Sequence, residues 1–225
     1  MSNYILLSQK KWHRDLFQTL CERSNESWQR ISSKEDFNID NLNKFNPDKI
    51  FIPHWSHIIP AEIFENFECI VFHMTDLPYG RGGSPLQNLI VRGHQETKIS
   101  ALKVDKGIDT GKVYLKAPLS LLGTAEEIFL RSVEVIERMI EYIIDKEPEP
   151  EEQRGEPVIF KRRKPQDGNL IGLENLAEVY NYIRMLDCEG YPSAFIETEH
   201  LRIEFSRAAI KADKSIKADV KISQK

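Results

Sequence analysis

The stretch that decides the fold is ECIVFHMTDLPYGRGGSPLQN, residues 68–88. It begins with a short, continuous apolar run at 68–72, of the kind that forms a strand buried on both faces of a sheet. His73 follows this strand directly and enters a loop rich in glycine. In open α/β sheets, ligands bind beyond the carboxyl ends of the strands. The pattern therefore predicts a buried strand that delivers a polar side chain to a ligand site.

Short apolar runs alternate with helical stretches on both sides of this segment. Strands are expected at 4–7, 28–31, 49–53, 98–104 and 113–116, and helices at 10–23, after Pro60 and at 125–144. Thr124 and Glu127 form a capping box at the start of the last helix. This alternation predicts an α/β fold, a Rossmann-like open, mainly parallel sheet with helices on both faces.

The composition changes after the long helix. Residues 146–159 are rich in proline and acidic side chains, so they are expected to form a linker that does not pack. The predicted domains are thus a catalytic domain at 1–145 and a small C-terminal α+β subdomain at 160–225. In the latter, a helix is expected at 173–183, strands at 194–196 and 201–205, and a frayed edge strand at the lysine-rich end.

Composition restricts the class of protein. The 225 residues have an ordinary hydrophobic fraction of 40% and a formal net charge of −4, which disfavours a nucleic-acid partner. No apolar stretch is long enough for a membrane helix, and three cysteines without a C-x-x-C pair fit a reducing cytoplasm. The sequence predicts a cytoplasmic protein that has a small-molecule substrate and no membrane partner, and it leaves a homodimer open.

Two residues of this chain are the main candidates for chemistry. Asp109 lies in the turn DKGIDTG, residues 105–111, which is 36 residues after His73. One crossover between them would return the chain beside the first strand and bring both side chains to the same end of the sheet. Ser84 and Gln87 form a second capping-box pattern, which predicts a helix start that favours anions.

The stretch from about residue 60 to 129 resembles the formyltransferases that use N10-formyltetrahydrofolate, a family that includes methionyl-tRNA and sugar N-formyltransferases. The matching motifs are His73, then Asp-Leu-Pro at 76–78, Arg81-Gly82, and Asp-Thr-Gly at 109–111. Segments 160–165, 180–184 and 191–195 also resemble the sugar enzymes. Residues 73–88 are most similar to formyltransferases of the pseudaminic acid pathway in glycan biosynthesis and to formylation domains of peptide synthetases.

The resemblance implies roles for particular residues. The catalytic set would be His73 and Asp109, with Asn88 or Thr75 replacing the family's asparagine, whose position is Val71 here. The formyl donor N10-formyltetrahydrofolate would lie along two loops, with the binding residues His54, Trp55, Ser56, His57, Ile58, Ile59, Asp105, Gly107 and Ile108. The acceptor would contact Gly80, Arg81, Gly82 and Gly83.

Other histidines and the basic run 161–164 carry weaker signals. His54 and His57 could suggest zinc, but no cysteine or carboxylate nearby completes a ligand set, so no metal is predicted. His13, His94 and His200 are expected at the surface. The basic run is either a solvated face or a diphosphate site.

The sequence therefore predicts an N-formyltransferase acting on the amine of a nucleotide-linked sugar, such as a UDP-4-amino-4,6-dideoxy hexose. The alternatives are formylation of methionyl-tRNA or of a carrier-bound aminoacyl group, and a folate- or nucleotide-binding protein without catalysis.

Overall fold

The computed structural model describes residues 1–225, and its core is a six-stranded sheet in the order β2-β1-β3-β4-β6-β7. Strands β1 (Asn3–Ser8), β2 (Ser27–Ile31), β3 (Lys49–His54) and β4 (Cys69–His73) run parallel. Strand β6 (Glu96–Lys103) pairs with β4 in the antiparallel sense, and β7 (Val113–Ser120) is its other neighbour. The predicted open, mainly parallel sheet is confirmed.

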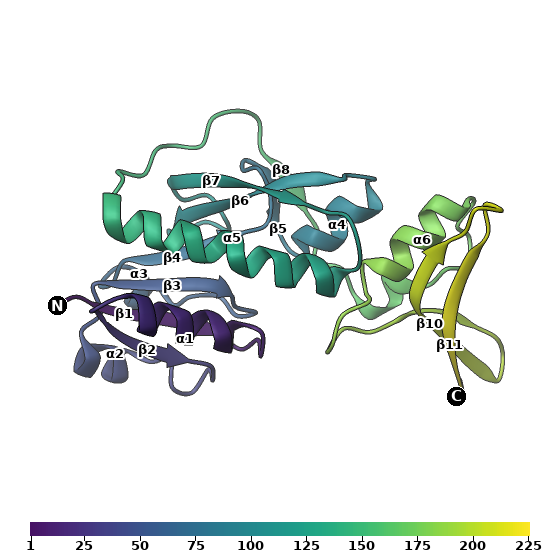
Figure 1. The fold of residues 1–225 in the computed structure, drawn as a ribbon, viewed down its shortest axis with the longest axis horizontal. Coiled ribbons are helices and arrows are strands. Elements are labelled where there is room, and N and C mark those ends of the chain that lie inside the picture. Colours follow the sequence, from purple (N-terminus) through teal and green to yellow (C-terminus); the bar gives the residue numbers. More distant parts are fainter. The chain divides into compact units, whose positions relative to one another are not determined.

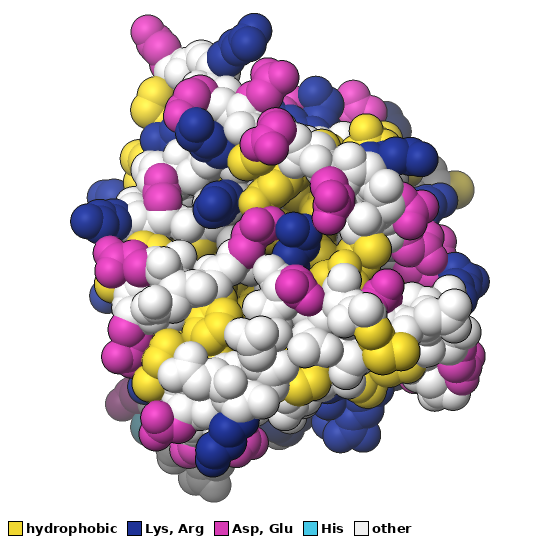
Figure 2. Space-filling view, turned by 90° about the vertical axis from the view of Figure 1, so that its left-hand side faces the viewer, with side chains coloured by type: hydrophobic (Ala, Val, Ile, Leu, Met, Phe, Trp, Pro, Cys, Tyr) yellow, Lys and Arg dark blue, Asp and Glu magenta, His cyan; other side chains and the backbone are white.

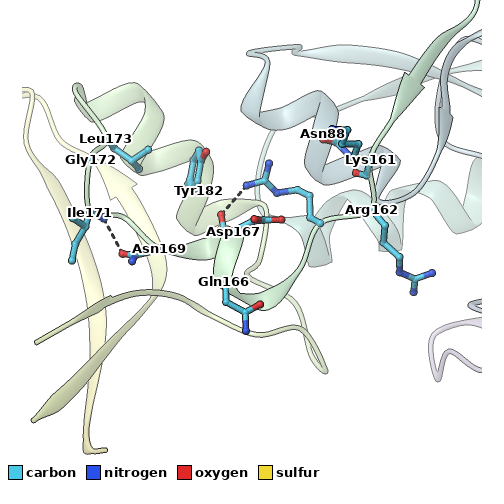
Figure 3. A pocket seen from close by; sticks show the side chains of 11 residues that line it. Asn88, Lys161, Arg162, Gln166, Asp167, Asn169, Ile171, Gly172, Leu173 and Tyr182 are labelled. Atoms are coloured by element: carbon cyan, nitrogen blue, oxygen red, sulfur yellow. Dashed lines mark hydrogen bonds between the residues drawn. The ribbon is translucent and has the colours of Figure 1, made fainter. Parts of the chain in front are cut away.

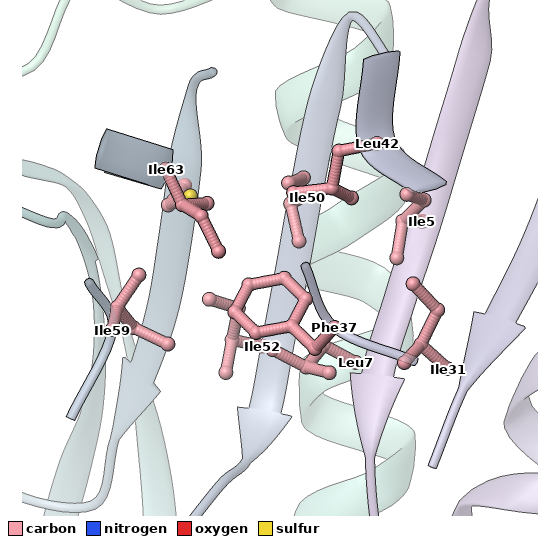
Figure 4. Packing of buried hydrophobic residues seen from close by; sticks show 10 residues of the cluster. Ile5, Leu7, Ile31, Phe37, Leu42, Ile50, Ile52, Ile59 and Ile63 are labelled. Carbon is pink, nitrogen blue, oxygen red and sulfur yellow. The ribbon is translucent and has the colours of Figure 1, made fainter. Parts of the chain in front are cut away.

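Helices cover both faces of this sheet (Figure 1). On one face, α1 (His13–Arg23) is joined to α5 (Ala125–Lys146) by an ion pair of 2.5 Å between Arg23 and Glu137. On the other lie α2 (Ile39–Phe45) and α3 (Ala61–Phe64), which contribute Leu42 and Ile63 to a cluster of buried side chains (Figure 4). The strands supply the rest of this cluster, including Ile5, Leu7, Ile50 and Ile52. Burial of these branched side chains holds the strand ends in place.

Two compact units can be distinguished. The first comprises residues 1–81, 98–119 and 130–159, and the second comprises residues 82–97, 120–129 and 160–225. Helix α4 (Pro85–Val91), η1 (Pro165–Gly168) and α6 (Leu176–Arg184) belong to the second unit, as do the antiparallel strands β9 (Ala194–Glu197), β10 (Leu201–Ile210) and β11 (Ile216–Gln224). The predicted domain boundaries at residues 145 and 160 stay a prediction.

Three local predictions are wrong. Residues 146–159 do not form a loose linker, because Glu151 exchanges two backbone hydrogen bonds with Val113, of 2.8 and 2.9 Å. They also contain the start of β8 (Val158–Phe160), which pairs with β5 (Tyr79–Gly82). Ser84 makes no capping bond; its hydroxyl accepts a hydrogen bond from the Arg163 N–H at 3.0 Å. By contrast, the Thr124–Glu127 capping box is present.

His13 is the third error, since it is buried and only 2% exposed. Its Nδ1 lies 2.6 Å from the Ser8 hydroxyl at the end of β1. Burial, with smaller contributions from His54, Arg30 and Lys10, lowers the pKa of His13 to about 3. This imidazole is therefore a neutral part of the core near neutral pH.

None of the helices combines the length and apolar character that crossing a bilayer requires. The face in Figure 2 intersperses lysine and arginine with aspartate and glutamate, and no broad region of one sign is visible there.

Candidate active site

The centre of the candidate site is His73, the last residue of β4, with 6% of its surface exposed. Its Nδ1 lies 3.6 Å from Oδ2 of Asp109, whose side chain is 18% exposed. Its Nε2 lies 2.8 Å from the carbonyl oxygen of Gly80, so this nitrogen is the donor of a hydrogen bond. We call His73 and Asp109 the buried pair. The two groups meet as the sequence predicts.

The path by which Asp109 reaches His73 differs from the predicted one. Strand β6 runs antiparallel to β4, with Ser100 opposite His73 and Lys103 opposite Ile70. No parallel crossover therefore carries Asp109 to the carboxyl end of β4. Instead the loop 104–112 folds back, and the Lys103 N–H donates to the Lys112 carbonyl at 2.8 Å.

The loop that carries Asp109 is tightly built. The Asp105 carboxylate accepts hydrogen bonds from the Gly107 N–H at 3.0 Å and from the Thr110 hydroxyl at 2.6 Å. A Cβ on Gly111 would stand 1.7 Å from the Lys103 carbonyl oxygen, so only glycine fits there. Asp109 itself has a φ of +55°, in the left-handed region that non-glycine residues rarely adopt. Asp105 thus stabilises the conformation of this loop, whether or not it also makes the predicted contact with the formyl donor.

The residues predicted for the formyl donor lie on two loops of the first unit. Trp55 and Val104 pack against the same buried cluster, to which Ile59 belongs with 8% exposure. Ile58 and Ile108, in contrast, are 86% and 68% exposed. These two exposed isoleucines lie on the loop after β3 and on the loop after β6, and the contacts with the formyl donor predicted for residues 54–59, 105, 107 and 108 stay predictions.

The two candidates for the missing asparagine have other contacts. The Asn88 amide nitrogen lies 2.9–3.0 Å from three carbonyl oxygens, those of Gly83, Ser84 and Lys161. These bonds use both of its N–H groups and leave none for an oxyanion. Thr75 is fully buried, and its hydroxyl lies 3.4 Å from the Gly80 carbonyl. The geometry therefore gives Asn88 a structural role.

The glycines of the loop are explained by close packing. A Cβ on Gly82 would lie 2.5 Å from the Phe160 carbonyl oxygen, and one on Gly83 would lie 2.5 Å from the Arg162 Cβ. Arg81 donates two hydrogen bonds to Oε1 of the Gln153 side chain, of 3.0 and 2.8 Å. The acceptor contacts predicted for Gly80 to Gly83 stay predictions.

Nearby, Asp76 receives hydrogen bonds from two lysines. Its carboxylate lies 2.6 Å from the Lys116 ammonium and 2.9 Å from that of Lys98. Burial by itself raises the pKa of Asp76, but these hydrogen bonds outweigh it and hold the pKa below its usual value. Asp76 is therefore ionised near neutral pH and fixes the turn after His73.

Gln153 is a residue of this site that sequence reasoning missed. It lies in the segment expected to be a linker, yet its side chain contacts Arg81 and the backbone of the Asp109 loop. A single glutamine in an acidic, proline-rich stretch has no sequence signature, so only the structure could have identified it.

The second unit has an open pocket of about 430 Å³, which we call the basic pocket. Its lining includes Lys161, Arg162, Arg163, Gln166 and Tyr182. The Arg163 guanidinium lies 5.3 Å from the centre of the Tyr182 ring and donates to the Asp167 carbonyl at 2.8 Å. In Figure 3, Tyr182, Asp167 and Gln166 line one side and Lys161 and Asn88 another. Exposed cations beside an aromatic ring suit a phosphate-bearing ligand. The structure contains no group of three or more histidine, cysteine, aspartate or glutamate side chains that could hold a metal ion.

Comparison with known proteins matches most of the chain to two family models. Residues 7–131 match the family model described as formyl transferase, and residues 165–223 match that of the methionyl-tRNA formyltransferase C-terminal domain. A solved structure of methionyl-tRNA formyltransferase from Clostridium thermocellum is 49% identical with a TM-score of 0.97, over 100% of both chains. Methionyl-tRNA formyltransferase of Gluconobacter oxydans is 28% identical over 72% of this chain and 55% of its own length. The chain spans 55–64% of the length of the first curated relatives it matches.

These matches correct the predicted acceptor. The nucleotide-linked sugar, with the pseudaminic acid pathway and glycan biosynthesis, is wrong, because the well-matched relatives are methionyl-tRNA formyltransferases. A 4-N formyltransferase from Francisella tularensis is similar with a TM-score of 0.69 over 97% of this chain and 96% of its own, but at 13% identity it shows the fold alone. The expectation that a nucleic-acid partner is unlikely is wrong for the same reason, since it rested on the net charge, which is an average over the whole chain.

Proposed function

Since the chain belongs to the formyl transferase family, we propose that it transfers a formyl group from N10-formyltetrahydrofolate to the amino group of methionyl-tRNA. The observation that carries the proposal is the buried pair, which lies in a chain similar over its whole length to a methionyl-tRNA formyltransferase. The match of residues 165–223 to the C-terminal domain of such enzymes supports the same acceptor.

We expect the donor to bind to the first unit. Ile58 and Ile108 would contact the faces of the pterin, while Trp55 and Ile59 hold the loop that carries Ile58. When bound, the donor supplies an activated formyl carbon. The chain has to supply a proton acceptor for the attacking amine, a donor for the oxygen on which charge develops, and a proton for the departing nitrogen.

His73 can fulfil these proton-transfer needs. An imidazole gains and loses a proton near neutral pH, and one positioned general acid–base group typically contributes about 10²–10⁴-fold to the rate. In the structure its Nε2 donates to the Gly80 carbonyl, so it must release this contact before it can accept a proton. Thr75 remains beside the same carbonyl and can keep it partnered.

Asp109 orients the imidazole and stabilises its charged form, as carboxylates do in other histidine-based sites. The separation of 3.6 Å exceeds a direct hydrogen bond, and such contacts commonly shorten when substrates bind. With Asn88 held by three carbonyls, the N–H of protonated His73 is the oxyanion donor that this chain offers in place of the family's asparagine.

The basic pocket suits the nucleic-acid part of the acceptor. Lys161 and Arg162 are exposed, and such side chains bind phosphates at little desolvation cost. Tyr182 offers a ring on which a base can stack once the Arg163 guanidinium moves aside.

The test is incubation of the protein with N10-formyltetrahydrofolate and methionyl-tRNA, with formylmethionine released from the tRNA and measured by mass spectrometry. We expect formylation that depends on His73 and does not occur with free methionine. Binding of the donor without any formylated product would contradict the proposal and favour a non-catalytic protein. Formylation of a carrier-bound aminoacyl thioester in preference to methionyl-tRNA would also contradict it.

A further inference from the structure

The segment from residue 147 to 158 is attached to the first unit at two points. Glu151 and Val113 exchange backbone hydrogen bonds of 2.8 and 2.9 Å. The Val158 N–H donates to the Pro78 carbonyl at 3.2 Å. Between these two attachments the backbone presents the Gln153 side chain to the loops around the buried pair.

The Gln153 carboxamide makes four hydrogen bonds. Its oxygen accepts from Nε and Nη2 of Arg81, at 3.0 and 2.8 Å. Its nitrogen donates to the carbonyls of Asp109 and Gly111, at 2.9 and 2.8 Å. A guanidinium can only donate and a carbonyl can only accept, so a single orientation of the amide satisfies all four contacts.

These hydrogen bonds connect the two segments that contact the His73 imidazole. Arg81 follows Gly80, whose carbonyl holds Nε2 of His73. Asp109, whose carboxylate faces Nδ1 of His73, has its own carbonyl bound by Gln153. The left-handed backbone at Asp109 is sparsely populated, and such conformations persist only when surrounding contacts hold them.

We infer that Gln153 is a positioning residue that fixes the Asp109 loop and the Gly80–Arg81 turn relative to His73. The inference rests on the proposed function. Neither a hydrocarbon nor a carboxylate can replace the amide, because the first offers no polar atom and the second offers no donor to the two carbonyls.

The test compares Gln153→Leu and Gln153→Glu with the matched control Glu152→Gln, whose side chain is 74% exposed and pairs only with Lys112 in this structure. We expect both Gln153 variants to lose about 10²-fold in kcat with little change in KM for methionyl-tRNA, since small misplacements of reacting groups have effects of that size. The control should match the wild type. Gln153→Glu keeps the contact with Arg81 and loses only the donor to the Asp109 and Gly111 carbonyls, so it tests these two hydrogen bonds separately.

A double-mutant cycle separates positioning from general stability. If Gln153 acts through Asp109, then Gln153→Leu should cost little further activity in an Asp109→Ala background. Losses that multiply in the double variant would overturn the role of Gln153 at the Asp109 loop, and near-normal kcat in both single variants would overturn the inference as a whole.

A measurement without substrate keeps this inference distinguishable from the proposed function. In ¹⁵N-labelled protein, the ring nitrogen signals of His73, assigned with His73→Ala, should move in Gln153→Leu and stay in place in Glu152→Gln. Unmoved signals in Gln153→Leu would refute the positioning role even if the enzyme is active. Absence of formyl transfer by the wild type would refute the proposed function alone.

Discussion

The buried pair and the basic pocket gather polar side chains in opposite ways. His73 is 6% exposed, and both of its ring nitrogens face acceptor groups within the first unit. Lys161 and Arg162 of the second unit are exposed to solvent. Burying polar groups is costly unless each finds a partner, whereas exposed charges cost little and contribute little to stability. The difference agrees with the proposed roles, in which the first region carries out the chemistry and the second recognises a charged partner.

The largest effect is expected when a member of the buried pair is removed, and this tests the contrast between the two regions most directly. In His73→Ala or Asp109→Ala, kcat should fall by about 10²–10⁴-fold, because acid–base help disappears while the recognition surface is intact. Single-turnover formylation of methionyl-tRNA measures this loss, and filter binding measures the affinity for tRNA. His200→Ala is the control, since its side chain is 78% exposed. A large loss of tRNA affinity with an unchanged rate would reverse the assignment of the two regions.

The buried character of the first unit also predicts how stability depends on pH. The folded protein lowers the pKa of His13 to about 3, chiefly through burial. An unfolded chain has a histidine pKa of about 6.5, so below this value the unfolded state binds the proton first. Stability is therefore fully present above pH 6.5 and declines as the pH falls toward 3.

Between pH 7 and pH 5 this one group should cost about 2 kcal/mol in the free energy of unfolding. Urea unfolding at several pH values measures the slope, and His13→Gln should flatten it. His200→Gln should keep the slope of the wild type. An equal slope in all three proteins would mean that His13 is not the group responsible.

The sequence could predict most of the sheet because hydrophobic periodicity reports burial directly. The run at 68–72 predicted β4, and the stripe on 125–144 predicted α5. The direction in which strands pair and the contacts of individual side chains could not be predicted from this periodicity. Nothing in the residues of β6 distinguishes parallel from antiparallel pairing with β4. Ser84, which was expected to cap α4, instead accepts a hydrogen bond from the backbone of Arg163, 79 residues away.

The candidate site was predictable only where side chains themselves carry the chemistry. His73 ends a strand and Asp109 lies in a loop after another strand, and both are residue types that can transfer or stabilise a proton, so their meeting could be predicted even though the assumed crossover was wrong. Gln153 acts through distant backbone carbonyls, and such contacts exist only in three dimensions. The acceptor was mispredicted because the motif residues at 73–111 are shared by formyltransferases in general, so they do not distinguish one acceptor from another.

The smallest expected effects belong to the basic pocket, where Lys161→Ala and Arg162→Ala each remove one exposed cation. Each should raise KM for methionyl-tRNA several-fold and leave kcat unchanged, because phosphate contacts position the acceptor without taking part in proton transfer. If the lost contact is to a phosphate, the slope of log K against log salt should become shallower by about 1. Lys217→Ala, an exposed lysine on β11 outside the pocket lining, is the control. A salt slope that is the same in the pocket variants, the control and the wild type would place the tRNA on another surface, while the buried pair would still account for the chemistry.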